Sequence, residues 1–138
     1  MERSDELRER MLSFYGALSS GDTDFLEEWY SSSPDLRAIG TDPEEWWQGA
    51  DKLIPVFREQ IKAMGGRMPI EAGDPEAFVE GDVGWVADRA NVRLPDGNAL
   101  PLRFTAVFVR EDGDWRAVQT HGSVGVGNQD SFGEDLPT

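Results

Sequence analysis

The sequence predicts an α+β domain in which about three N-terminal helices pack on one face of a curved, mainly antiparallel sheet. Apolar residues recur at helical spacing between Leu7 and Met64, and from Met68 onward the spacing changes toward two, which is typical of strands. Turn signals rich in glycine and aspartate separate the later segments. With 138 residues the chain is long enough for one continuous core and too short for a second, so we expect a single domain.

The first two helices are expected to form a hairpin near the N-terminus. Ser4 and Asp5 can cap the first helix, whose apolar residues repeat at helical spacing until Ser19-Ser20-Gly21 ends it. A second, shorter helix begins at Asp22 and stops before Pro34. The two helices should therefore pack against each other across a brief turn.

A short strand, a turn and a third helix are expected next. The strand runs from Leu36 to Ile39 and leads into the turn Gly40-Thr41-Asp42-Pro43. The third helix begins at Gly49-Ala50-Asp51 and ends at Gly65-Gly66. The segment between turn and helix holds two adjacent tryptophans among carboxylates, which makes it a place where chemistry can be sought.

The remainder of the domain is expected to be a meander of strands. The candidate strands cover residues 69–72, 77–79, 83–94, 100–110 and 115–124. The segment from Gly125 to Thr138 is rich in glycine, aspartate and asparagine. We therefore expect one domain over residues 1–124, followed by a loosely ordered acidic tail over residues 125–138.

The charge of the chain excludes two classes of partner. Acidic residues number 27 against 13 basic ones, which gives a net charge of -14 and an isoelectric point near 4.3. A field of that sign repels phosphate backbones and anionic lipid, so neither nucleic acid nor a membrane surface is an expected partner. Only Lys52 and Lys62 are lysines. An acidic surface poor in lysine fits a high-salt environment, but ordinary solubility from a carboxylate-rich surface is the favoured interpretation.

Several kinds of site are also excluded by residue type. The chain has no cysteine, which rules out disulfides, thiol catalysis and thiolate metal sites. One histidine and scattered carboxylates give no metal-binding pattern, so no metal or other cofactor is expected. No apolar run reaches the roughly 20 residues of a membrane span, and the N-terminus lacks the apolar core of a signal peptide. We therefore expect a cytoplasmic location.

Four segments carry a resemblance to a known family. They are Tyr15 to Asp22, Ile39 to Gly49 with its Glu45-Trp46-Trp47, Glu80 to Val86, and Asp114-Trp115-Arg116 with His121 and Ser123. In order and spacing they resemble the SnoaL-like branch of the nuclear transport factor 2-like superfamily. The resemblance covers roughly Leu7 to Ser123 and implies a cone-shaped, cystatin-like roll. Because the superfamily includes ketosteroid isomerase, polyketide cyclases, scytalone dehydratase, limonene epoxide hydrolase and noncatalytic members, it leaves open whether this chain is an enzyme.

Two positions depart from the ketosteroid isomerase pattern. The resemblance places the oxyanion tyrosine of such enzymes where Phe14 stands, and Tyr15 is one residue, about 100°, further round the helix. The catalytic base would fall near Gly40, with Asp42 close by. The resemblance therefore does not extend to that specific chemistry.

His121 and Asp42 are the candidate catalytic residues. His121 is the only histidine, and imidazole is the side chain most suited to acid-base work near neutral pH. The alternative is a histidine that only holds strand geometry. Asp42 lies beside the tryptophans, where burial can raise a carboxyl pKa, as it can for Glu45. The alternative for both carboxylates is a role in the turn itself.

The candidate ligand pocket is mainly aromatic. Because Trp46 and Trp47 are adjacent, at most one faces a given pocket, and the other anchors the turn to the core. Arg103, like Asp88, would be a costly buried charge on the inner sheet face unless paired. The full set of candidate pocket residues is Tyr15, Trp46, Trp47, Trp85, Phe104 and Arg103, with His121 beside them.

Two functions follow as hypotheses. The first is a cup that binds an apolar or aromatic metabolite, with cofactor-free isomerisation, cyclisation or dehydration if it is catalytic, and His121 or Asp42 as base. The second is a noncatalytic dimeric module for protein interaction or assembly, its cup filled by its own side chains. Both faces of the long strands carry apolar groups, so we expect a homodimer through the outer sheet face.

Overall fold

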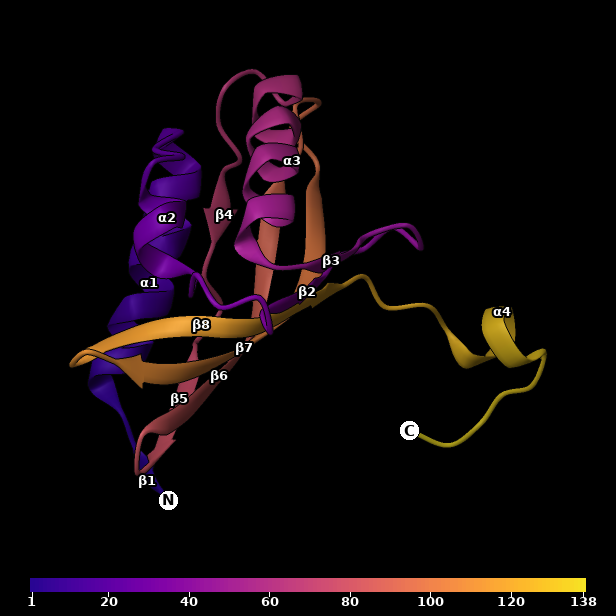
Figure 1. The fold of residues 1–138 in the computed structure, drawn as a ribbon. Helices are drawn as coiled ribbons and strands as arrows, with labels where there is room; N and C mark the ends of the chain where they lie inside the picture. The colour runs from indigo at the N-terminus through magenta and orange to yellow at the C-terminus, as the bar shows by residue number, and fades with distance from the viewer.

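The computed structural model describes all 138 residues and places the three N-terminal helices on one face of a curved, open sheet (Figure 1). The predicted α+β class is confirmed. The helices are α1 (Asp5–Ser20), α2 (Phe25–Trp29), α3 (Ala50–Ala63) and α4 (Asn128–Phe132). The strands are β1 (Glu2–Arg3), β2 (Arg37–Ile39), β3 (Trp46–Gln48), β4 (Ile70–Glu71), β5 (Glu76–Glu80), β6 (Val83–Arg93), β7 (Ala99–Glu111) and β8 (Asp114–Ser123).

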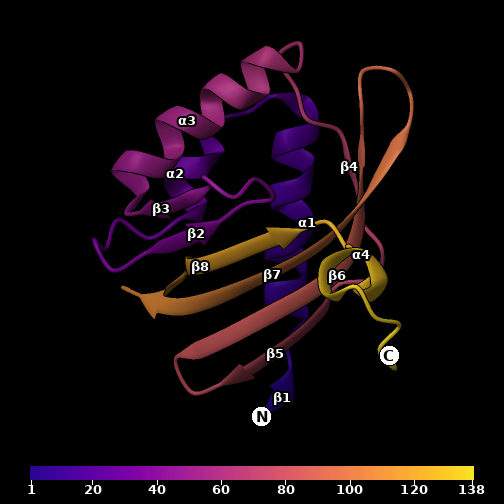
Figure 2. The same cartoon turned by 90° about the vertical axis from the view of Figure 1, so that its right-hand side faces the viewer.

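The sheet has the strand order β1-β5-β6-β7-β8-β2-β3, with β4 paired to β6 beyond the end of β5. All its pairs are antiparallel except β2 with β8, which are parallel. Seen from the side, α3 crosses above the sheet while α1 runs behind it (Figure 2). None of the helices is both long and apolar enough to cross a membrane.

Helix α1 begins and ends where its sequence predicts. The Ser4 hydroxyl accepts a hydrogen bond from the Leu7 N–H at 3.1 Å, which caps the first turn. Gly21 ends the helix with a left-handed φ of 78°, a conformation that glycine adopts without strain. The buried side of the helix includes Met11 and Phe14, which are at most 1% exposed.

Two short strands were not predicted. Strand β3 pairs with β2 and includes both Trp46 and Trp47, in a segment where the sequence suggests a turn leading to a helix. Strand β1 pairs with β5 ahead of α1. Strands of two or three residues carry no readable periodicity, and they form here because a neighbouring edge offers backbone partners.

The cross-strand register separates the side chains of the sheet into two faces. One row across five strands is Val86, Ala106, Thr120, Ala38 and Trp47, and it faces the helices. The adjacent row is Ala87, Thr105, His121, Ile39 and Trp46, and it faces away from them. Successive residues of a strand point to opposite faces, so a site on one face cannot use the neighbouring row.

Aromatic side chains fill the inner face of the cone. The Phe14 ring stacks on Trp29 with centroids 4.0 Å apart and on Phe104 at 5.8 Å. Tyr30 and Phe57 meet the Phe14 ring edge-on, at 6.1 and 6.3 Å. Such contacts stabilise beyond the area that they bury. Phe14 is therefore the centre of the core rather than part of a cavity wall.

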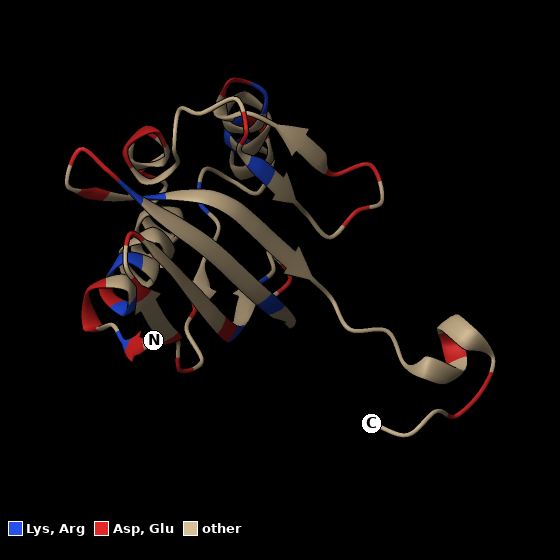
Figure 3. Cartoon of the chain, turned by 60° about the horizontal axis from the view of Figure 1, so that its bottom comes forward, with Lys and Arg blue, Asp and Glu red and all other residues tan.

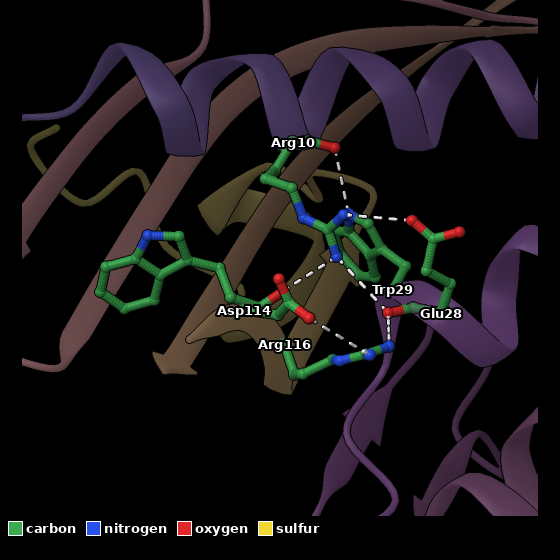
Figure 4. A network of polar contacts seen from close by, with 6 residues as sticks. Arg10, Glu28, Trp29, Asp114 and Arg116 are labelled. Carbon is green, nitrogen blue, oxygen red and sulfur yellow. Dashed lines mark hydrogen bonds and ion pairs between the residues drawn. The ribbon is translucent and has the colours of Figure 1, made fainter. Parts of the chain in front are cut away.

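A polar network ties α1, α2 and β8 together at one end of the cone (Figure 4). The Arg10 guanidinium donates to the Trp115 carbonyl at 2.9 Å, and both Arg10 and Arg116 donate to the Glu28 carbonyl. In return the Trp29 indole N–H donates to the Arg10 carbonyl at 3.0 Å. Burial lowers the pKa of Arg10 below its ordinary value. The network fixes how the helical hairpin meets the sheet.

Candidate functional site

The turn before β3 is built from its own carboxylates. Asp42 accepts the Glu44 N–H at 2.9 Å, and Glu45 accepts the Asp42 N–H at 2.9 Å through one oxygen. The other Glu45 oxygen accepts the Gln60 amide of α3 at 2.5 Å. A Cβ at Gly40 would lie 2.6 Å from the Glu45 carboxylate, so the turn needs glycine there. Asp42 is exposed and Glu45 half-buried. The structure thus gives both carboxylates the turn-forming role that the sequence left open.

The two adjacent tryptophans point to opposite faces of the sheet. Trp47 is half-buried and packs against the core cluster. Trp46 is 61% exposed and lies on the outer face. Only Trp47 therefore faces the inside of the cone.

The inner face holds one buried polar pair. The Tyr15 hydroxyl donates to an Asp88 carboxylate oxygen at 3.0 Å. The same carboxylate accepts the backbone N–H groups of Gly73, at 3.2 Å, and Asp74, at 2.9 Å. The period-two pattern of β6 puts Asp88 on the same face as Val86 and Ala90, and only the fold brings Tyr15 and the loop at Gly73 to it. A carboxylate that accepts three hydrogen bonds fixes this loop against α1.

Burial raises the pKa of the two tyrosines of the chain, Tyr15 and Tyr30, well above the ordinary phenol value of about 10. For Tyr15 the nearby Asp88 charge adds to burial. The folded protein thus keeps two phenol protons that the unfolded chain loses above about pH 10, so the two groups stabilise the fold fully below that pH. Tyr15 therefore acts as a hydrogen-bond donor at neutral pH.

Stability is consequently expected to fall as the pH rises above about 10. Because the folded state holds two phenol protons that the unfolded chain has released, the free energy of unfolding should fall by up to about 2.7 kcal/mol per pH unit. Urea denaturation at pH 9 and pH 11 measures this loss, and the Tyr15→Phe variant should show a smaller one. An unfolding midpoint that does not change over this range would contradict the prediction.

His121 lies on the outer face, away from the buried pair. It is exposed, between Thr105 of β7 and Ile39 of β2. No carboxylate lies within ion-pair distance of its imidazole. The structure therefore brings His121 together with neither Asp42 nor Asp88.

The predicted site residues do not line one cavity. Tyr15, Trp47 and Phe104 belong to the inner side, where Phe104 stacks on the core. The residues on the outer face are Trp46, Trp85, Arg103 and His121. There Trp85 stacks on Phe78 at 6.2 Å, and the Arg103 guanidinium donates to the Ser123 hydroxyl at 3.1 Å. The expectation of one shared pocket is wrong: of these residues only Phe104 and Arg103 line the same hollow, and the sheet separates Tyr15 and Trp47 from Trp46, Trp85 and His121.

Two surface hollows have volumes above 500 Å³. One of about 590 Å³ lies between the end of α2 and the start of α3; its wall includes Tyr30, Ile54 and Arg58. Another of about 530 Å³ lies beside β6 and β7, and its wall includes Ala87, Arg103 and Phe104 together with the carboxylates of Asp74, Glu76 and Asp88. Volumes of 300 to 1,000 Å³ are typical of ligand sites. Neither hollow is lined by His121 or Asp42.

The helices on one side of a curved open sheet, with an uncovered opposite face, give the chain the fold seen in solved nuclear transport factor 2-like proteins. The sequence profile of the SnoaL-like domain matches residues 7–127, and the chain belongs to this family. None of the curated proteins compared with the chain matches it.

Solved structures agree with this assignment at the level of the fold. A nuclear transport factor 2-like protein of unknown function from Pseudomonas putida superposes with a TM-score of 0.81 at 16% identity, over 95% of this chain and 91% of that one. A candidate dehydratase from Streptomyces avermitilis gives 0.75 at 15% identity, over 88% and 95%. A candidate ketosteroid isomerase from Shewanella frigidimarina gives 0.70 at 13% identity, over 83% and 92%. At such identities the likeness establishes fold and not activity.

Proposed function

We propose that the protein is a homodimeric assembly module whose interface is the outer face of the sheet. One observation carries the proposal: apart from Glu111 and Asp114 beside the β7–β8 turn, the outward residues of β6, β7 and β8 include no carboxylate, in a chain of net charge -14 (Figure 3). The other outward residues are Val83, Trp85, Ala87, Arg89, Asn91, Arg93, Pro101, Arg103, Thr105, Val107, Val109, Arg116, Gln119, His121 and Ser123. Two acidic copies repel each other unless they meet at such a surface.

The charges at the edges of this face support pairing with a second copy. On the β5 side the outward row carries Glu76 and Glu80. On the opposite side it carries Arg37. A two-fold axis parallel to the strands would place the acidic edge of one copy against the basic edge of the other, as an isologous interface requires. The apolar centre, Trp85 and Val107, would then be covered.

The filled inner side supports assembly rather than catalysis in the cup. Phe14, Trp29 and Phe104 occupy the centre of the cone, and the Asp88 carboxylate is engaged by the chain itself. Asp42 holds a turn. The groups that were candidates for proton transfer in the cup therefore have structural partners or lie outside it.

The test is the mass in solution of a Val107→Asp variant. Light scattering at micromolar concentration should give twice 15.4 kDa for the natural chain and 15.4 kDa for the variant. A carboxylate in the centre of the apolar face should weaken the dimer by roughly 100-fold or more. The matched control is Val56→Asp, which adds the same charge at a 38% exposed position of α3 and should remain dimeric. A natural chain that is monomeric would overturn the proposal.

Small-molecule binding is a second candidate, favoured by the 590 Å³ hollow with its partly apolar wall. An apolar or aromatic metabolite would contact Tyr30 and Ile54 there. Isomerisation, cyclisation or dehydration would then depend on the carboxylates at its rim, Glu27, Asp51 and Glu59. In a thermal-shift screen of aromatic metabolites, Ala50→Trp should remove a stabilising effect that His121→Gln preserves. If His121→Gln removes the stabilising effect and Ala50→Trp preserves it, the ligand binds on the His121 face instead.

A further inference from the structure

The hollow of about 590 Å³, where α2 lies beside α3, combines an apolar wall with carboxylates (Figure 2). Tyr30, Ile54 and Pro55 supply the apolar part. Asp51 and Glu59 of α3 lie on either side of Pro55 in the sequence, four residues from it in each direction. Residues at this spacing follow one another along one side of a helix. A molecule in the hollow therefore meets apolar surface and two carboxylates together.

The one arginine in this wall, Arg58, is already engaged by other carboxylates. Its guanidinium donates to Glu27 of α2 at 3.0 Å and to Asp24 at 3.3 Å. Asp51 and Glu59 have no basic group within the 4.0 Å of an ion pair. Two negative charges without a cationic partner therefore stand beside the apolar wall.

The acidic surface continues beyond this hollow. A second hollow of about 260 Å³ adjoins the first, since Glu27, Tyr30 and Ser32 line both. The other residues in its wall are Glu111, Asp112, Asp114 and Arg116. Here too the acidic residues outnumber the basic one. Concave surfaces lined by charges of one sign concentrate their field and attract ligands of the opposite sign.

We infer that the hollow of about 590 Å³ binds a small organic cation, in which an ammonium group is joined to an apolar or aromatic body. The body would contact Tyr30 and Ile54, and the ammonium group would lie near Asp51 and Glu59. The net charge of -14 also disfavours an anionic ligand at this place. The inference rests on the second candidate function, small-molecule binding, and adds the charge of the ligand. Because the hollow is on the helical side, a dimer through the outer sheet face leaves it open.

Three ligands of similar size and different charge test the inference. They are phenethylamine, phenethyl alcohol and hydrocinnamate, which are cationic, neutral and anionic at neutral pH. Their dissociation constants are measured with the full chain at low salt, by titration followed through backbone amide NMR shifts. The amine should bind about tenfold more tightly than the alcohol, and the carboxylate should bind most weakly. Because exposed charges are screened by salt, about 0.5 M sodium chloride should remove most of the difference between amine and alcohol.

Neutral variants of the two carboxylates locate the bound amine. Asp51→Asn and Glu59→Gln should each weaken amine binding by about threefold, and by about tenfold together, while alcohol binding stays unchanged. The matched control is Glu6→Gln, which removes one exposed carboxylate of α1 outside the hollow and should leave amine binding unchanged. Ala50→Trp should weaken the binding of both ligands, because a large side chain then occupies part of the hollow.

The outcomes separate the inference from the function on which it rests. An alcohol that binds as tightly as the amine overturns the cationic class and leaves small-molecule binding standing. Amine binding that Asp51→Asn and Glu59→Gln do not weaken overturns the assignment to this hollow. If none of the three ligands shows saturable binding at millimolar concentration, both the inference and small-molecule binding at this hollow are overturned. The solution mass of the natural chain tests the dimer separately.

Discussion

Replacement of Phe14 by alanine is expected to lower the free energy of unfolding by about 3–5 kcal/mol. The side chain is 1% exposed, and its ring lies within 6.3 Å of five other aromatic rings. They come from α1, α2, the residue after α2, α3 and β7. The cavity left by truncation cannot close easily, because Trp29 and Phe104 are held on its two sides by their own neighbours. Urea denaturation followed by tryptophan fluorescence measures the change.

The Phe14→Leu variant separates volume from stacking. Leucine restores most of the buried volume, so it should cost less than about half of the alanine variant. Equal losses for the two variants would show that ring geometry, and not volume, determines the contribution of this position. A loss below about 1 kcal/mol for alanine would contradict a filled cone and would favour an open cavity for a ligand.

Local signals in the sequence predicted the main elements of the fold because each signal acts on its own neighbours. Ser4 caps α1, Gly21 ends it, and the change of spacing near Met68 marks the start of the strands. The short strands β1 and β3 could not be predicted in this way, since they exist through their partners β5 and β2. The family resemblance added the cone, which no local signal contains.

The candidate site was predicted less well, and the reason is geometric. Periodicity tells which residues of one strand share a face, but it does not say whether that face is inside. Trp85 and His121 share the outer face, and Phe104 belongs to the inner one. Aromatic character suggested that all three line one cup, whereas the fold places the sheet between them. An apolar outer face is what a covered interface needs, so the same residues now support dimerisation.

The acidic turn illustrates a second limit. Carboxylates near tryptophans fit both catalysis and turn formation, and only the positions of their partners distinguish these roles. Asp42 meets the Glu44 N–H, and Glu45 meets the Gln60 amide of α3. Gln60 is 15 residues from Glu45 in the chain, so that contact has no local signature.

Replacement of Asp88 by alanine is expected to lower the free energy of unfolding by about 3 kcal/mol or more. The change leaves three donors without their acceptor: the Tyr15 hydroxyl and the N–H groups of Gly73 and Asp74. The unsatisfied Tyr15 hydroxyl is buried and costs about 1–3 kcal/mol, and each of the two backbone hydrogen bonds of the exposed loop adds about 0.5–1.5 kcal/mol. The control is Glu76, an exposed carboxylate of β5 that lies opposite Ala87, and Glu76→Ala should change stability by less than about 0.5 kcal/mol.

The Tyr15→Phe variant decides whether Asp88 acts mainly through the tyrosine or through the loop. It removes one donor and leaves Asp88 with its two backbone partners, so the loss should be only about 1 kcal/mol. In a double-mutant cycle the two changes should then be less than additive, because both remove the same hydrogen bond. Full additivity would show that the pair does not interact in solution. A Tyr15→Phe loss as large as that of Asp88→Ala would instead assign the whole effect to the tyrosine, with the loop contributing nothing.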